Sequence, residues 1–133
     1  MDEQILVAIN TDQDIVAARQ QGRSLALRLG FSSGDATLIA TAISELVRNI
    51  VSYAQRGEVE LCAVNGSARR GIQIVARDRG PGIADVKQAL RHGFSTSGSL
   101  GLGLPGVMRL VDEFEIVSEV GSGTTVKLKK WKP

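Results

Sequence analysis

The chain of 133 residues has few of the side chains that form cross-links and metal sites, with one cysteine and one histidine. A single cysteine, Cys62, excludes a disulfide within the chain and fits a reducing compartment. His92 has no cysteine or histidine partner at metal-ligand spacing. No apolar run approaches the ~20 residues of a membrane span, and the first ten residues lack the basic start of a signal peptide. We therefore expect a soluble cytoplasmic protein without a membrane segment.

Aromatic residues are scarce at 4%, and neither sign of charge dominates, because 16 Lys and Arg face 14 Asp and Glu. The basic residues cluster only at the end, at Lys127, Lys129, Lys130 and Lys132. Nucleic-acid surfaces need concentrated positive charge, and single strands also need aromatic side chains for stacking. We expect no nucleic-acid partner. The ordinary hydrophobic content of 43% predicts one globular domain over residues 1–133.

The N-terminal half has the pattern of one strand followed by two helices. Residues 4–9 are β-prone, and Thr11 or Asp12 can cap a helix that runs to about Leu29 and ends at Gly30. A second helix is expected over about 35–54, capped by Ser32 or Ser33, with an apolar stripe at helical spacing. This stripe contains Ile39, Ile43, Leu46 and Ile50, and the polar residues between are Thr41, Glu45, Arg48, Asn49 and Ser52.

The C-terminal half alternates as strands. Residues 58–64 and 71–78 predict a hairpin around Asn65-Gly66, and residues 114–120 and 124–130 predict a second one around Gly121 to Gly123. Between them lie a short amphipathic segment, 84–91, and a helix from about 106 to 112. This order predicts an α+β fold, a two-layer α/β sandwich with a mixed, mainly antiparallel sheet and helices on one face.

The sequence GLGLPG, Gly101 to Gly106, matches the G-x-G-x-x-G pattern of dinucleotide-binding folds and protein kinases. No strand precedes it, so the dinucleotide-binding interpretation fails on context. The lysine, catalytic-loop and metal-binding motifs of eukaryotic-type protein kinases are absent, and so is a Walker loop. The glycines need another explanation.

Three groups of residues can carry chemistry. Glu45 and Asn49 are four residues apart, so they share a helix face where a carboxylate and an amide oxygen can serve a hydroxyl proton and a hard metal ion. The alternative is an ordinary solvated helix face. Asp78, at a strand end before two glycines in DRGPG, can accept a hydrogen bond from a ligand amino group. The alternative there is a simple glycine-proline turn.

The third group is Gly101-Leu102-Gly103, which precedes a helix and can present backbone N–H groups to an anion. Hydroxyl side chains just upstream add further donors, at Ser95, Thr96, Ser97 and Ser99. The alternative is a flexible Gly/Ser loop. The three groups occur in a fixed order with Gly123-Thr124-Thr125, which opens the last predicted strand, and the complete set is stronger evidence for a site than any one group alone.

The ordered set resembles the GHKL ATPases, the superfamily of DNA gyrase and histidine kinases, over nearly the whole chain. In that resemblance ELVRN, Glu45 to Asn49, is similar to the N box, and DRGPG to the D-x-G-x-G box of the Bergerat nucleotide fold. Asn49 would then bind Mg²⁺, Asp78 would bind the adenine amino group of ATP, and Thr125 would lie beside the adenine with Asp78. The remaining residues implied in cofactor binding are Gly80, Gly82 and Ile83 around adenine, and Thr96, Ser97, Gly101, Leu102 and Gly103 at the phosphates.

Within the superfamily the chain is most similar to small bacterial anti-sigma-factor serine/threonine kinases, through DIVAARQ, TAISELVRNI and GFSTSGSLGLGLPG. The resemblance implies Glu45 as general base towards a serine on a STAS-domain antagonist or scaffold in a stressosome-type partner-switching module. It also implies a PPM-type phosphatase that the released kinase binds and activates. Two other functions stay open: a direct anti-sigma factor that sequesters a sigma subunit, and a detached ATP-binding module without a protein substrate.

Overall fold

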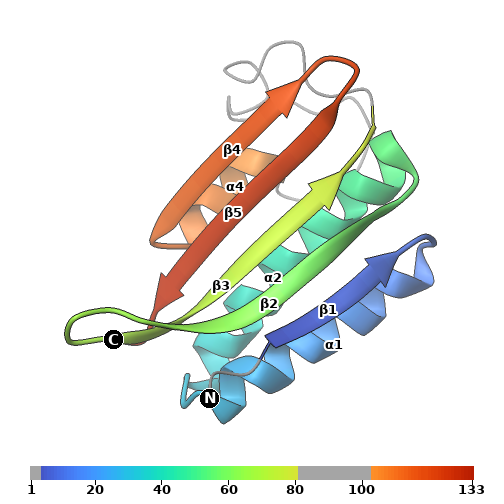
Figure 1. Ribbon diagram of the computed structural model, residues 1–133. Coiled ribbons are helices and arrows are strands. Elements are labelled where there is room, and N and C mark those ends of the chain that lie inside the picture. The colour runs from blue at the N-terminus through green and yellow to red at the C-terminus, as the bar shows by residue number, and fades with distance from the viewer. Residues whose placement is uncertain (1–3, 81–102) are drawn as a thin grey trace.

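A computed structural model describes residues 4–80 and 103–133 (Figure 1). They form one five-stranded sheet in the order β1-β2-β3-β5-β4, with the helices on one of its faces (Figure 1). The strands are β1 Gln4–Ile9, β2 Gly57–Asn65, β3 Arg70–Asp78, β4 Glu113–Glu119 and β5 Gly123–Trp131. The helices are α1 Gln13–Arg28, α2 Ser33–Asn49, the π-helical turn η1 Ile50–Ala54, and α4 Gly103–Leu110.

The predicted α+β sandwich with helices on one face and a mainly antiparallel sheet is confirmed. All four strand pairs in the described part of the chain are antiparallel. The C-terminal hairpin inserts β5, and not β4, beside β3. Because β3 ends where β5 begins, Asp78 stands opposite Thr124 at one edge of the molecule. This arrangement positions the candidate site.

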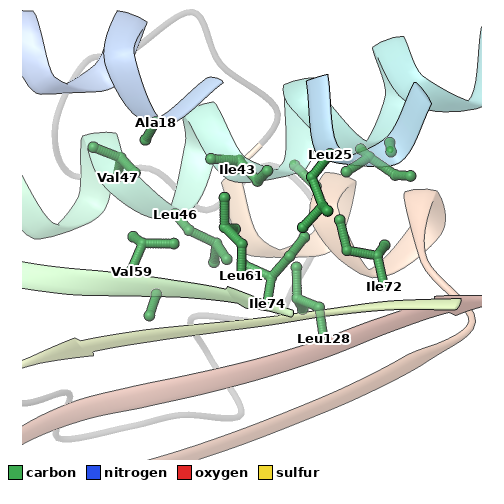
Figure 2. Packing of buried hydrophobic residues seen from close by; sticks show 14 of the residues in the cluster. Ala18, Leu25, Ile43, Leu46, Val47, Val59, Leu61, Ile72, Ile74 and Leu128 are labelled. Atoms are coloured by element: carbon green, nitrogen blue, oxygen red, sulfur yellow. The ribbon is translucent and has the colours of Figure 1, made fainter. Parts of the chain in front are cut away.

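The core lies between the helices and alternate residues of the central strands (Figure 2). Ile43 and Val47 of α2 are fully buried between the helices and the sheet, where Ile43 lies above Leu61 of β2 and Val47 lies above Val59 of the same strand (Figure 2). Complete burial of such side chains stabilises the fold by roughly 1.5–3 kcal/mol each relative to exposure. The apolar stripe predicted on the second helix is therefore the side that packs on the sheet.

The start of α2 agrees with the sequence prediction, and its end does not. Ser32 is the N-cap, and its hydroxyl accepts a hydrogen bond from the Asp35 N–H at 3.1 Å. We expected one regular helix to about residue 54, but the regular helix ends at Asn49 and continues as the π-helical turn η1. Such wider turns recur at functional sites. Helix α4 begins at Gly103, earlier than its predicted start near 106.

The start of α1 also differs from the prediction. Asp12 has helical backbone angles and makes no capping hydrogen bond with its side chain. Instead, the Asp14 carboxylate turns back and accepts the N–H groups of Asn10 at 2.7 Å and Thr11 at 3.0 Å. These backbone donors lower the pKa of Asp14 from its ordinary value. An acid in the first turn of the helix thus binds the backbone just before the helix, where a capping side chain was expected.

The basic C-terminal strand does not form a patch of one sign. Lys127 and Lys129 stand opposite Glu115 and Glu113 of β4 in the sheet register. Lys130 points to the other face and donates to the Leu110 carbonyl at 3.1 Å, at the end of α4. The lysines are thus distributed over two faces and partly matched by acids. None of the helices in the two described segments is long and apolar enough to cross a membrane.

Asp14→Asn should destabilise the protein at neutral pH, because an amide accepts the two N–H groups more weakly than a carboxylate. A lowered pKa contributes stability above the ordinary aspartate range, and this contribution is lost as the pH falls through the lowered pKa. The melting temperatures of parent and variant should therefore converge in acid. Thermal unfolding followed by circular dichroism tests this, with Asp12→Asn as the matched control. A difference that is independent of pH would contradict the account.

Gly123→Ala should cost much more stability than Gly121→Ala. Both glycines have positive φ, +110° and +84°, where an added Cβ costs roughly 1–2 kcal/mol in either case. At Gly123 the Cβ would also collide with the Asp78 carbonyl oxygen and lie 2.8 Å from Arg79 Cα, whereas no described atom lies within 4 Å at Gly121. Overpacking against backbone adds about 1–3 kcal/mol. Urea unfolding of both variants measures the difference, and equal losses would contradict the close approach.

Candidate functional site

The first part of the site is the carboxylate of Asp78 at the end of β3. Its Oδ1 accepts the N–H of Gly80 at 2.9 Å and the N–H of Thr124 at 3.2 Å. Neither of these bonds uses Oδ2. The carboxylate is half-buried and lies on the helix-facing side of the sheet, as Ala76 and Ile74 do two and four residues earlier. It is a fixed acceptor at the edge of the core.

The threonine that lies beside Asp78 is Thr124, and this corrects the prediction for Thr125. In the register of β3 and β5, Asp78 pairs with Thr124 and Arg77 pairs with Thr125. Because side chains alternate along a strand, the Thr125 side chain is on the face away from the helices. The Thr124 side chain shares the helix-facing side with Asp78 and contacts Ser118 of β4, with 2.8 Å between the two hydroxyl oxygens.

Gly80 and Gly123 allow the backbone to pack closely around Asp78. A Cβ on Gly80 would lie 2.8 Å from the Cα of Ala54, the last residue of η1. A Cβ on Gly123 would strike the Asp78 carbonyl. The π-helical turn, the end of β3 and the start of β5 therefore meet at these two glycines. This contact joins the end of the helix that carries Glu45 and Asn49 to the strand that carries Asp78.

The second part of the site is Glu45 on α2, which is only 6% exposed and so is not on a solvated helix face. Its Oε1 accepts the Arg48 guanidinium at 2.8 Å, and its Oε2 accepts the backbone N–H of Gly103 at 3.3 Å. Gly103 is the first residue of α4 and has φ +66°. A buried carboxylate is stable only with such partners. The contact therefore brings Glu45 next to Gly103, the last residue of Gly101-Leu102-Gly103.

Asn49 is half-buried at the last position of α2, one turn beyond Glu45, where the regular helix gives way to η1. Among the described residues, no group of three or more histidine, cysteine or acidic side chains is placed to hold a metal ion. Asn49 offers one amide oxygen, and Mg²⁺ in nucleotide sites commonly takes other oxygen ligands from phosphates and water.

The structure thus brings the predicted residues together in two groups, Glu45 with Gly103, and Asp78 with Gly80. The structure does not describe some of the residues for which the sequence made predictions: Gly82, Ile83, Thr96, Ser97, Gly101, Leu102 and the 84–91 segment. The sequence analysis did not predict the contacts of Arg48 with Glu45, of Thr124 with Asp78, or of Ser118 with Thr124. A signal was present for Arg48, which lies three residues after Glu45 on one helix face. For the other two residues, only the exact register of the last hairpin could have identified them.

Solved structures with the same fold include RsbU and RsbW domains from Mycobacterium tuberculosis, with a TM-score of 0.65 and 23% identity. That match covers all of this chain and 33% of the other. A mycobacterial sensor histidine kinase, MprB, matches over 100% of this chain and 99% of its own, with a TM-score of 0.57 and 14% identity. At these identities the likeness supports the fold alone.

Sequence relatives identify the family. The "Histidine kinase-like ATPase domain" family matches residues 9–130. The serine/threonine-protein kinase RsbT of Bacillus subtilis is 50% identical over 131 residues, covering 98% of both chains. An anti-sigma F factor of Halalkalibacterium halodurans is 34% identical over 99 residues, covering 71% of this chain and 68% of the relative. The chain therefore belongs to the histidine kinase-like ATPase domain family, an ATP-binding family, and within it to the group of RsbT-like serine/threonine kinases.

Proposed function

We propose that this chain is a cytoplasmic protein serine/threonine kinase that transfers the ATP γ-phosphoryl group to a serine of a STAS-domain antagonist or scaffold protein. After release from that scaffold it binds and activates a PPM-type phosphatase, so that it acts in a stressosome-type partner-switching module. The observation that carries the proposal is the buried Glu45 carboxylate beside the first N–H of α4. A proton acceptor held next to a phosphate-binding motif suits transfer to a hydroxyl group.

The adenine end of the nucleotide is assigned to Asp78. Oδ1 is engaged by backbone N–H groups of Gly80 and Thr124, so the orientation of the carboxylate is set before a ligand arrives. Oδ2 can then accept a hydrogen bond from the exocyclic amino group of adenine. In this proposal the adenine neighbour is Thr124 in place of Thr125.

At the phosphate end, Asn49 supplies an amide oxygen for Mg²⁺. A bound Mg²⁺ would supply positive charge that offsets the negative charge developing on the phosphates during transfer. Glu45 lies one helical turn earlier, so its carboxylate and the Asn49 amide follow one face of α2. The N–H of Gly103, the first residue of α4, points to Glu45 on this face, and the start of a helix favours negative charge. The chain's own residues thus orient the phosphates and the acceptor hydroxyl.

Glu45 accepts the serine proton in this proposal, and its two oxygens have different tasks. The Arg48 bond to Oε1 is short, at 2.8 Å, and fixes the side-chain rotamer. The Gly103 bond to Oε2 is long, at 3.3 Å, so it is the weaker contact and the one a substrate hydroxyl can replace. Arg48 is therefore a positioning residue. It holds the carboxylate while the other oxygen meets the substrate.

A second candidate is a direct anti-sigma factor that sequesters a sigma subunit in a nucleotide-dependent way. It is favoured by the anti-sigma F factors among the relatives, which reach 34% identity over 71% of the chain. The kinase relative is 50% identical over 98% of the chain and supports the first proposal more strongly. Incubation with γ-labelled Mg-ATP and either a STAS-domain protein or a sigma factor separates the two. Serine-linked label on the STAS protein supports the kinase, and nucleotide-dependent capture of sigma without label supports the alternative.

Glu45→Gln should slow phosphoryl transfer to the STAS protein by about 10²–10⁴-fold, because the variant keeps the side-chain shape and loses the proton acceptor. Affinity for ATP should change little, since the adenine contacts lie at Asp78. Single-turnover transfer and calorimetric binding measure the two effects. Glu115→Gln, on the face of the sheet away from the helices, is the matched control. Transfer at the parent rate by the Glu45 variant would refute the base assignment.

Asn49→Ala should abolish most of the Mg²⁺-dependent part of ATP binding. The parent should bind ATP more tightly with Mg²⁺ than with a chelator, whereas the variant should bind similarly in both conditions because an oxygen ligand is missing. Asn49→Asp retains an oxygen ligand and should restore part of the metal effect. Calorimetry under the two conditions gives the comparison. If the parent binds ATP with the same affinity with and without Mg²⁺, the assignment of Asn49 as a metal ligand is wrong.

A further inference from the structure

Arg48 is a partly exposed cation at the phosphate end of the site, and none of the steps proposed above gives it a contact with the nucleotide. It lies on α2 three residues after Glu45 and one residue before Asn49. Its Nη1 donates to Glu45 Oε1 at 2.8 Å, while Glu45 Oε2 accepts the Gly103 N–H at 3.3 Å. The Arg48 side chain is 39% exposed, whereas that of Glu45 is 7% exposed. A partly exposed guanidinium is therefore bonded to a carboxylate that is almost fully buried.

The proposed role of Glu45 creates a problem of charge for ATP. A general base must come within hydrogen-bond reach, about 2.6–3.2 Å, of the hydroxyl that attacks the γ-phosphorus. The Glu45 carboxylate then lies close to the negative γ-phosphate, and like charges repel more strongly where water is excluded. ADP lacks the γ-phosphate and avoids this repulsion, and Mg²⁺ accompanies both nucleotides. Without a further cation, the site would favour ADP, which is the product of the reaction.

We propose that Arg48 binds the γ-phosphate of ATP while it remains bonded to Glu45, and that it thereby makes the site prefer ATP to ADP. The inference rests on the proposed kinase function, with Glu45 as the general base. The hydrogen bond to Glu45 uses Nη1, one of the three guanidinium nitrogens. A guanidinium carries five N–H donors in one plane, so it can bond a carboxylate and a phosphate oxygen at the same time. Arg48 then binds substrate in addition to positioning the base.

The position of Arg48 on α2 suits this contact. Residues three and four apart are neighbours on a helix surface, so Arg48 and the proposed metal ligand Asn49 both lie beside Glu45. Two basic residues of the central strands are engaged elsewhere. Arg77 forms its ion pairs on the face of the sheet away from the helices, and Lys130 donates to a backbone carbonyl at the end of α4. Because Arg48 is bonded to the base directly, its charge is well placed to offset that of Glu45.

The test measures the affinities for ATP and ADP, each with Mg²⁺ and without a protein substrate, by displacement of a fluorescent ADP analogue. Arg48→Gln should lower ATP affinity about 10-fold and ADP affinity less than about twofold, because only ATP carries the phosphate that loses a charged partner. Arg48→Lys retains the charge and should lose less of the ATP preference. Arg69→Gln is the matched control and should keep both affinities, since Arg69 lies over the Trp131 ring just before β3, at the end of this strand opposite Asp78.

The same comparison in a Glu45→Gln background separates a direct contact from an effect through the base. The double variant has no unpaired buried charge, so it keeps the test open if Arg48→Gln alone does not fold. A direct contact predicts that Arg48→Gln lowers the ATP preference in this background too. A role confined to holding Glu45 predicts that the double variant has the same preference as Glu45→Gln alone, and that result would overturn the proposal. Equal losses for ATP and ADP would also overturn it.

The kinase function and the role of Arg48 can fail separately. If no serine of the STAS protein is labelled although Arg48→Gln loses the ATP preference, the proposed kinase function is wrong and the contact with the γ-phosphate stands. If the serine is labelled and Arg48→Gln keeps the ATP preference of the parent, only the role of Arg48 is wrong.

Discussion

The carboxylate of Asp78, held by the backbone N–H groups of Gly80 and Thr124, is the interaction on which the candidate site depends. It fastens the end of β3 to the start of β5 and points a charged acceptor towards the helix layer. A half-buried carboxylate in such a place is stable because two donors meet it. Glycine is needed at position 123 for this contact between the strands. A Cβ there would collide with the Asp78 carbonyl and push β3 and β5 apart.

The buried carboxylate of Glu45 provides the corresponding constraint at the other end of the site. It links α2 to the first residue of α4 through a contact 58 positions apart in the sequence. The π-helical turn after Asn49 connects the two ends, because its last residue packs against Gly80. The packing of α2 against the sheet thus positions the carboxylates of both Glu45 and Asp78. The packing of the core and the geometry of the site have the same cause.

Much of this could be predicted from the sequence. Period-two and helical spacing predict the strands and helices, and the resemblance of the ordered motifs to the GHKL ATPases predicts a nucleotide fold. Three features could not be predicted, each for a physical reason. Thr124 and Thr125 are chemically alike, and only the register of β5 against β3 decides which one faces Asp78. The burial of Glu45 depends on α4, which is distant in sequence. The cap of α1 uses Asp14 because its carboxylate satisfies two N–H groups at once.

The most direct test of the account is the energetic coupling between Asp78 and the amino group of adenine. Calorimetry should compare ATP with the purine riboside triphosphate that lacks this amino group, in the parent and in Asp78→Asn. The parent should prefer ATP by about 10- to 100-fold, the value of a hydrogen bond to a charged group, and the variant should bind both nucleotides alike. An equal preference for ATP in parent and variant would contradict the assignment of Asp78 as the adenine-binding residue.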